Sequence, residues 1–325
     1  MGNNMLKGVF LVALGASFYG MLATFVKLAY GEGYTTAEVT TSQFVLGILG
    51  MGLLQWLWPK FSGKSFPEVA KSDKRKLFLA GTSMGGTSLF YYIAVQYINV
   101  SVAIVLLMQS VWISVFVEAV LSRTWPQFRK VVAVFIVLLG TVLATNVMGK
   151  TVALDWRGLF WGFMAAVSFS VTMFSANGLA TYASPYAKTF WMLLGGGSVI
   201  ALFLVFGQLG PYYSEKLRAV HGFFSENRSD VRAFDFSIFI KYGLVLSLFG
   251  TVLPPVLFNA GFPKVGLGLG SIVSSVELPV SVMMAYVLLN EKVALVQWFG
   301  IGLILFAIVL MNLPAMKTFR SRKRS

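Results

Sequence analysis

The chain is a succession of long apolar stretches separated by short polar connections. Ten stretches carry about 20 residues each, the length that crosses roughly 30 Å of hydrocarbon at 1.5 Å per residue. Most are apolar on all sides, whereas the helices of a soluble domain keep a polar face. The pattern predicts transmembrane helices over residues 7–30, 37–58, 77–98, 101–122, 131–148, 158–182, 187–208, 238–258, 267–289 and 295–313.

The composition agrees with a bilayer environment. Charged residues make up 12% of the 325 residues and the mean hydropathy is +0.77, whereas a soluble domain carries roughly 25% charged residues. The first apolar stretch continues to about Tyr30 without a small-residue cleavage site. We therefore expect a retained first helix and not a removed signal peptide. Glycines such as Gly81, Gly85 and Gly195 are expected to let helices pack closely.

The basic residues predict the orientation in the membrane. The formal net charge is +14, and the Lys and Arg residues gather in the connections 59–76 and 123–130 and in the C-terminal tail, while 31–36 carries none. The longer loop 209–237 holds both signs of charge and weighs little in the positive-inside rule. We expect an inner-membrane protein with both termini in the cytoplasm. The same distribution favours contact with anionic lipid headgroups over nucleic acid.

The two halves of the sequence resemble each other, and we expect one repeat in residues 1–150 and a second in residues 151–325. A constant shift of 168 residues aligns Phe90 with Phe258, Ile104 with Ile272, Val105 with Val273, Gln109 with Glu277 and Leu121 with Leu289. A shift of 151 aligns Ser17–Phe18 with Ser168–Phe169. Because five helices are an odd number, the second repeat would enter the membrane from the opposite side. Such inverted-topology repeats are typical of secondary transporters.

The last two predicted helices carry a motif that is similar to a known family. Its elements are Glu277 with Pro279, Asn290 with Glu291, and Gln297 with Gly300. This motif resembles the EamA-type branch of the drug/metabolite transporter superfamily. The sequence departs from the family where Glu-Leu-Pro replaces adjacent Glu-Pro and where Arg123 stands in the first-half copy of Glu291. The resemblance implies two five-helix inverted repeats, transport of small metabolites and no bound cofactor.

Polar residues inside the predicted helices are the candidate substrate-binding residues. Glu277 lies about ten residues into its helix and Gln109 about eight into its own from the other side, so both are near the midplane. A charge there costs roughly 2.5–3.5 kcal/mol and needs a reason. Glu277 fits an ammonium partner, a proton carrier or a protonated structural residue. The further candidates, weighed against packing roles, are Tyr19, Tyr91, Trp112, Ser168, Asn177, Trp191 and Asn259.

Prolines predict where the helices open. Pro279 removes a backbone donor two residues beyond Glu277, and the pair Pro254–Pro255 is expected to break the eighth helix. We expect these three prolines to take part in gating. The remaining charges are expected to be peripheral: Glu118 paired with Arg123, Lys188 in a cytoplasmic connection, Glu291 at the membrane edge and His221 on an external loop.

The sequence predicts a secondary transporter with alternating access, whose two five-helix halves rock about a central polar cavity. Amino acids or related amines are the first expected substrates, protons are the candidate coupling ion, and a monomer or homodimer is expected. The alternatives are an importer of a vitamin- or nucleoside-like metabolite, favoured by the 15% aromatic content, and a non-transporting membrane scaffold. One His, no Cys and no paired carboxylates disfavour an enzyme, and no metal or cofactor is expected.

Overall fold

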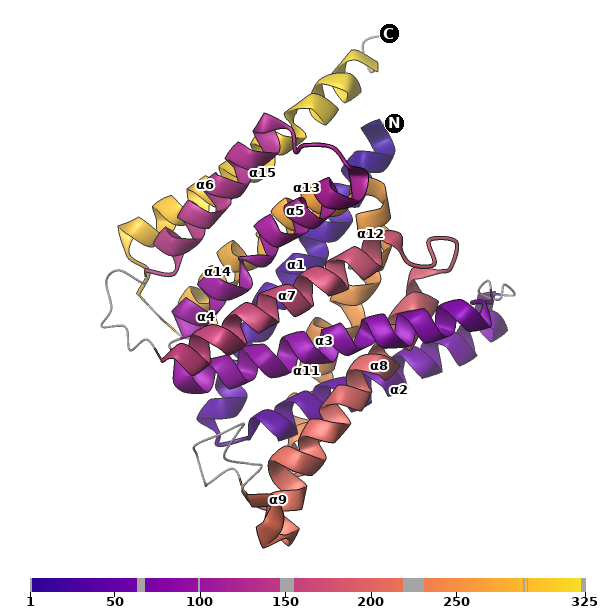
Figure 1. The fold of residues 1–325 in the computed structure, drawn as a ribbon, viewed down its shortest axis with the longest axis vertical. Helices are drawn as coiled ribbons and strands as arrows, with labels where there is room; N and C mark the ends of the chain where they lie inside the picture. The colour runs from indigo at the N-terminus through magenta and orange to yellow at the C-terminus, as the bar shows by residue number, and fades with distance from the viewer. Residues whose placement is uncertain are drawn as a thin grey trace.

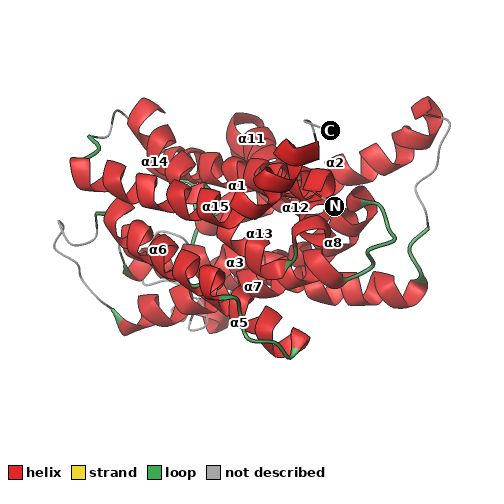
Figure 2. Cartoon of the chain, turned by 90° about the horizontal axis from the view of Figure 1, so that it is seen from above, coloured by secondary structure: helices red, strands yellow, loops and turns green. Residues whose placement is uncertain are grey.

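The computed structural model describes residues 2–62, 68–98, 100–146, 155–218, 231–288, 290 and 292–322. Every regular element in this part of the chain is helical, which confirms the all-α prediction (Figure 2). The α-helices are α1 (Gly2–Gly31), α2 (Thr36–Ser62), α3 (Lys71–Tyr97), α4 (Val100–Leu107), α5 (Ser110–Ser122), α6 (Phe128–Ala144), α7 (Trp156–Gly178), α8 (Pro185–Leu204), α9 (Gly210–Tyr213), α11 (Leu244–Ser247), α12 (Leu253–Val265), α13 (Leu267–Ser274), α14 (Glu277–Leu288) and α15 (Leu295–Arg322). Three π-helices interrupt them: η2 (Val205–Leu209), η4 (Phe239–Gly243) and η5 (Leu248–Val252).

Seven segments in the described part of the chain are long and apolar enough to cross a membrane. They are Asn3–Gly31, Thr36–Leu57, Val102–Ser122, Trp156–Gly178, Pro185–Tyr213, Phe239–Val265 and Leu267–Leu288. The other three predicted spans fall on α3, α6 and α15. Glycine, serine and threonine lower the hydropathy of α3, α6 has only 17 residues, and the apolar part of α15 is the shorter stretch Leu295–Met311. Ten crossings therefore stay a prediction.

The start of α1 and the end of α15 lie at the same end of the molecule (Figure 1). We call this the terminal end and the opposite one the far end. At the terminal end Gly8 of α1 packs against Lys264 and Val265, so the turn between α12 and α13 also lies there. The far end holds the α1–α2 turn, the η2 helix and the beginning of η4.

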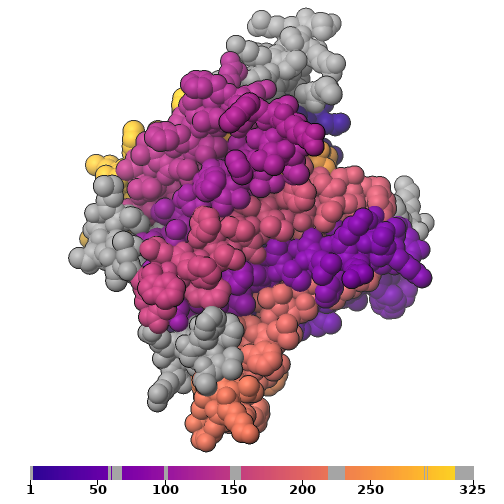
Figure 3. Space-filling view, viewed as in Figure 1, coloured from indigo at the N-terminus to yellow at the C-terminus, as the bar shows by residue number. Residues whose placement is uncertain are grey.

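The helices of the two predicted repeats interleave. α1 packs along α12 and α14, α3 packs along α7 and α8, and α6 packs along α15. Each of these contacts joins a helix of residues 1–150 to a helix of residues 151–325. Figure 3 shows one face of this arrangement, where α7 lies between α3 and the pair α5 and α6. The halves are therefore not two separate bundles.

Glycines allow two of these contacts to be backbone against backbone. A Cβ at Gly195 of α8 would lie 1.8 Å from the Phe78 carbonyl oxygen of α3. A Cβ at Gly300 of α15 would lie 2.3 Å from the Ala144 nitrogen of α6. No side chain fits at either position. Small residues supply close van der Waals packing where lipid supplies no hydrophobic force between helices.

The double proline does not end its helix as the sequence predicts. The segment Phe239–Val265 is continuous, and Pro254 and Pro255 occupy the first turn of α12. A first-turn proline lacks only a donor that the α-helix does not use. The preceding turn, Leu248–Val252, is π-helical. The helix therefore accommodates the two prolines by a change of helical register and does not end. π-turns of this kind are frequent at functional sites.

Candidate functional site

Two helices break in the interior at equivalent positions of the chain. α4 ends at Leu107 and α5 begins at Ser110, while α13 ends at Ser274 and α14 begins at Glu277. The shift of 168 residues aligns these two breaks to within a residue. The broken helices also touch, because the Ser271 hydroxyl of α13 donates to the Val111 carbonyl oxygen of α5 at 3.4 Å. Gln109 and Glu277 each stand at one of the breaks.

Glu277 opens α14 against the first helix. Gly20 of α1 faces the Glu277 backbone so closely that a Cβ there would lie 2.4 Å from the Glu277 carbonyl oxygen. The side-chain Oε2 of Glu277 is buried and has no hydrogen-bond partner in the described part of the chain. An unsatisfied carboxylate oxygen in a low-dielectric interior is costly. A proton or a bound cation at this oxygen would remove that cost.

Two tyrosines from the first half lie near this carboxylate. Tyr19 of α1 and Tyr91 of α3 are close enough for the charge of Glu277 to act on both phenols. The Tyr19 ring also packs edge-on against Phe169 at 6.1 Å and Phe258 at 5.6 Å between ring centroids. The structure thus brings together three of the predicted site residues, surrounded by aromatic rings.

Gln109 has a different environment. Its Nε2 donates to the Val105 carbonyl oxygen of α4 at 2.9 Å, and its Oε1 accepts a hydrogen bond from the Trp112 indole of α5 at 2.9 Å. Trp112 is partly exposed on the outside of α5. No hydrogen bond between the described residues joins Gln109 to Glu277. The predicted pairing of these two residues in one site stays a prediction.

Asn259 and Ser168 lie in contacts between helices. The Asn259 amide donates to the Thr189 hydroxyl of α8 at 3.0 Å, while its Oδ1 is buried without a partner among the described residues. The Ser168 hydroxyl donates to the Ser83 carbonyl oxygen of α3 at 3.0 Å. Asn259 therefore keeps a free acceptor, and Ser168 has a satisfied packing role.

Trp191 and Asn177 lie away from the helix breaks. The Trp191 ring lies 5.5 Å from the Lys74 ammonium, at the beginning of α3. Asn177 is in the last turn of α7. Neither forms a hydrogen bond or ring contact with Glu277, Tyr19 or Tyr91 in the described part of the chain, and the structure does not group them with these residues.

Pro279 stands in the first turn of α14, just after the break. Proline has no backbone N–H, so the series of backbone hydrogen bonds is interrupted at this residue. On either side of it, the Leu278 N–H donates to the Ser275 carbonyl oxygen and the Val280 N–H donates to the Val276 carbonyl oxygen. The opening thus lies at Ser275–Val276, on the N-terminal side of Glu277 and not beyond it.

Several charged residues lie elsewhere than the sequence suggests. Glu118 pairs with Lys130 of α6 and not with Arg123, which adopts a left-handed conformation (φ 51°) that ends α5. Lys188 is only 1% exposed, and its ammonium donates to the Ala176 carbonyl oxygen at the end of α7 at 2.9 Å. Glu291 and His221 lie outside the described residues.

Sequence reasoning missed a polar cluster at the far end of the molecule. Glu38 of α2 is fully buried and contacts Thr35, Gln208, Arg232 and the backbone of Asp235. The spacing of Thr35 and Glu38 is a capping-box signal that could have identified Glu38. Its other partners could not have been identified, because they are remote in the sequence.

An interleaved helical bundle with seven membrane-length apolar segments in the described part of the chain is typical of a polytopic membrane protein. Comparison with known proteins agrees with this class. The chain matches the EamA-like transporter family over residues 6–146 and 156–313, and it belongs to that family. The resemblance to the EamA branch of the drug/metabolite transporters is thereby confirmed. The family is one of membrane transporters and not of enzymes.

A curated relative and a solved structure extend the comparison. The "Uncharacterized inner membrane transporter YicL" of Salmonella typhimurium is 23% identical over 320 residues, covering 97% of this chain and 98% of that protein. A solved structure described only as "Crystal structure of protein" superimposes with a TM-score of 0.68 at 14% identity. It covers 93% of this chain and 97% of that one. At that identity, the likeness shows the fold alone.

Proposed function

We propose that this protein is a secondary transporter of amino acids or related amines, and that Glu277 binds their ammonium group. The observation that carries the proposal is the buried Oε2 of Glu277, which has no partner among the described residues. An ammonium group supplies three donors and a positive charge, and a charge-assisted hydrogen bond is stronger than a neutral one. A substrate amine would satisfy this oxygen.

The surroundings of Glu277 suit the rest of such a substrate. Tyr19 packs against the rings of Phe169 and Phe258, and its chain neighbour Gly20 packs against the Glu277 backbone. An amine with an apolar or aromatic body would place that body against these rings. The same rings favour the second candidate, a vitamin- or nucleoside-like aromatic metabolite, which would bind through stacking and would not need the charge of Glu277.

Protons are the proposed coupling ion. A proton and a substrate ammonium would compete for the same carboxylate oxygen, since each neutralises the buried charge. Binding of one would release the other, which is the elementary requirement for exchange of substrate against protons. This competition at Glu277 favours export driven by proton entry.

Alternating access of a ten-helix inverted repeat in the inner membrane is the proposed mechanism. Two family matches, one in each half, and two equivalent helix breaks support the repeat. The shared position of the chain ends and the basic connections support cytoplasmic termini, and the YicL relative is named an inner-membrane protein. Because the halves interleave, we propose that groups of helices drawn from both halves move, with the breaks and the η5 π-turn as hinges.

A ligand scan of the purified protein tests the substrate assignment. Thermal stability would be measured in detergent against amines, amino acids and aromatic metabolites, at two pH values, for the parent and for Glu277→Gln. A ligand at 100 times its dissociation constant stabilises by roughly 2.7 kcal/mol. Glu68→Gln is the matched control, since its side chain is 88% exposed.

We expect stabilisation by ammonium compounds in the parent and in Glu68→Gln, and its loss in Glu277→Gln. Hits would then be counter-tested for transport in proteoliposomes with an imposed pH gradient. Ammonium compounds that stabilise Glu277→Gln as well as the parent would refute the role of Glu277. Stabilisation by uncharged aromatic metabolites in both proteins would support the second candidate.

A further inference from the structure

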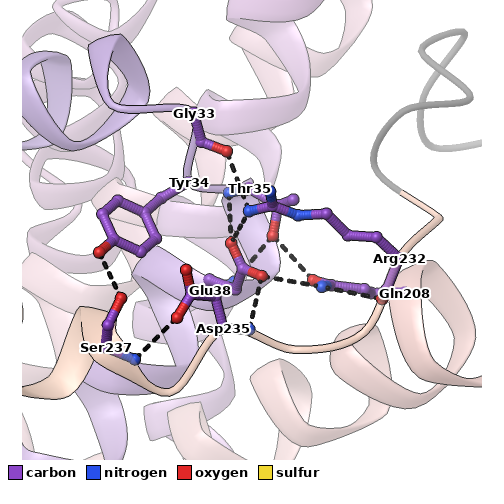
Figure 4. Close-up of polar contacts among 8 residues, drawn as sticks. All are labelled: Gly33, Tyr34, Thr35, Glu38, Gln208, Arg232, Asp235 and Ser237. Atoms are coloured by element: carbon purple, nitrogen blue, oxygen red, sulfur yellow. Dashed lines mark hydrogen bonds and ion pairs between the residues drawn. The ribbon is translucent and has the colours of Figure 1, made fainter.

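The polar cluster at the far end ties together three segments that are remote in the sequence (Figure 4). Glu38 Oε2 accepts from Arg232 at 2.7 Å, and Glu38 Oε1 accepts from Gln208 at 3.1 Å and from the Asp235 backbone N–H at 2.9 Å. Thr35 adds a hydrogen bond from its hydroxyl to Gln208 Oε1 at 2.7 Å. The α1–α2 turn is thus joined to the end of η2 and to the segment that leads into η4.

Further contacts extend the same connection. Arg232 also donates to the Gly33 carbonyl oxygen at 2.9 Å, and the Tyr34 and Ser237 hydroxyls lie 2.6 Å apart (Figure 4). In every case one partner belongs to residues 33–38 and the other to residues 208–237. The cluster therefore holds the first half of the chain to the second at this end.

Glu38 and Arg232 differ in burial, so the ion pair between them can be both strong and separable. Its side chain is 0% exposed and is saturated with donors, whereas the Arg232 side chain is 41% exposed. A buried carboxylate that loses its partner leaves an uncompensated charge, so the closed arrangement is favoured while the pair is intact. Arg232 can leave towards water, because its side chain is only partly buried.

The connection between the halves at the terminal end is exposed: the Tyr182 hydroxyl donates to the Asp73 carboxylate at 2.8 Å and accepts from the Ala70 N–H at 3.1 Å. There the Glu118–Lys130 ion pair stays within the first half, joining α5 to α6. It meets the second half only by packing, since a Cβ at Gly268 of α13 would touch the Glu118 carboxylate. The two ends therefore differ in burial: the carboxylate of the far end is fully buried, whereas the Tyr182–Asp73 contact at the terminal end is exposed.

Building on the proposed transport function, we propose that Glu38 and Arg232 form a latch that holds the substrate pathway closed at the far end. The latch opens when Arg232 leaves Glu38 and the segment 232–237 moves away from the α1–α2 turn. In this structure the latch is engaged. By the predicted orientation the far end faces the outside of the cell.

A thiol-accessibility experiment tests the latch without any need for a substrate. The chain has no cysteine, so Tyr19→Cys introduces a unique thiol, about 18 Å along α1 from its far end. A membrane-impermeant methanethiosulfonate reagent would be added to intact cells. The rate of labelling would be compared in backgrounds that carry Glu38→Gln, Arg232→Gln or Arg232→Lys.

We expect labelling about tenfold faster or more in Glu38→Gln and Arg232→Gln, the shift produced by losing a charged hydrogen bond. Arg232→Lys keeps the charge and should stay closer to the parent. The matched control is Glu32→Gln, because Glu32 pairs with Lys241 at the same end but both side chains are about half exposed. An exposed pair contributes little, and we expect no change in labelling.

Unchanged labelling in both Glu38→Gln and Arg232→Gln would overturn the latch. So would loss of the folded protein in both variants, because a latch opens the bundle without unfolding it. Arg232→Gln is the decisive variant. The Arg232 side chain is partly exposed, so its replacement should disturb the buried interior less than the replacement of Glu38. Faster labelling together with a failed ligand scan would keep the latch and reject the amine substrate, so the two proposals fail separately.

Discussion

The helix pairs α4–α5 and α13–α14 break at equivalent positions, but their polar residues are satisfied differently. Gln109 meets its own needs locally, since it donates to Val105 and accepts from Trp112. Glu277 has a buried oxygen with no partner in the described part of the chain. A carboxamide carries both donors and acceptors and can form its hydrogen bonds with residues nearby in the chain, whereas a carboxylate only accepts. The equivalent helix breaks determine where the two polar residues lie. The chemistry of each side chain determines which of the two can still bind a ligand.

The backbones at the two breaks differ as well. In α5 the Val111 N–H donates to the Met108 carbonyl oxygen at 3.1 Å. The residue equivalent to Val111 in the second half is Pro279, which has no N–H to donate. The N–H at this position is therefore used at the first break and missing at the second. The half that carries the unsatisfied carboxylate also carries this proline.

The largest effect is expected from removing the charge at the second break. Glu277→Gln should weaken binding of an ammonium ligand by about 10- to 100-fold, the value of a hydrogen bond to a charged group. Titration calorimetry with a ligand from the scan measures this change. Equal affinity in parent and variant would mean that the two breaks are functionally alike.

Gly20→Ala should act next most strongly, because it presses on the second break from α1. The new Cβ would lie 2.4 Å from the Glu277 carbonyl oxygen, and overpacking of this kind costs about 1–3 kcal/mol. Gly50→Ala is the control, since a Cβ there meets nothing within 4 Å. The melting temperature in detergent should fall for Gly20→Ala and hold or rise for Gly50→Ala. A fall in both would point to general helix effects.

Val111→Pro would remove from the first break the backbone N–H donor that the second break lacks. Val111 is 1% exposed, and loss of its hydrogen bond to Met108 should cost about 1 kcal/mol of stability. The reciprocal Pro279→Val should change stability less. If thermal unfolding showed Val111→Pro to be as stable as the parent, the backbone difference between the breaks would carry no energetic weight.

The smallest effect is expected from Gln109→Ala. Its hydrogen bonds are local, to Val105 of α4 and Trp112 of α5, so ligand affinity should fall by less than about threefold and stability by about 0.5–1.5 kcal/mol. The same calorimetry and melting measurements apply. A loss of affinity as large as that of Glu277→Gln would place Gln109 at the ligand after all.

The sequence predicts the apolar framework well, because membrane length and hydrophobicity are local properties. Each predicted span overlaps a helical segment, and the aligned pair Gln109 and Glu277 marks both breaks. The double proline misleads, since proline at a first helical turn is tolerated and the π-turn before it absorbs the register change. Local rules identify the residue that disturbs a helix, but the neighbouring turns decide how the helix responds.

Charged residues are harder to place from sequence. Lys188 reads as a solvated basic residue of a connection, yet it is buried against the end of α7. Glu38 reads as a helix-capping residue, but most of its partners lie 170 or more positions away in the chain. Such contacts depend on which helices become neighbours, and a single sequence does not contain that information in local form.

The glycine contact between α6 and α15 has a consequence for biosynthesis. α6 ends at Ala144, whereas its partner α15 begins at Leu295. During translation, the glycine face of α6 therefore stays without its partner until α15, one of the last helices to be synthesised, has been inserted. The early helices can insert, but their final packing depends on the end of translation. A chain truncated before Gly300 would leave this face of α6 without its partner helix. Such an incompletely packed protein would be a substrate for membrane quality control.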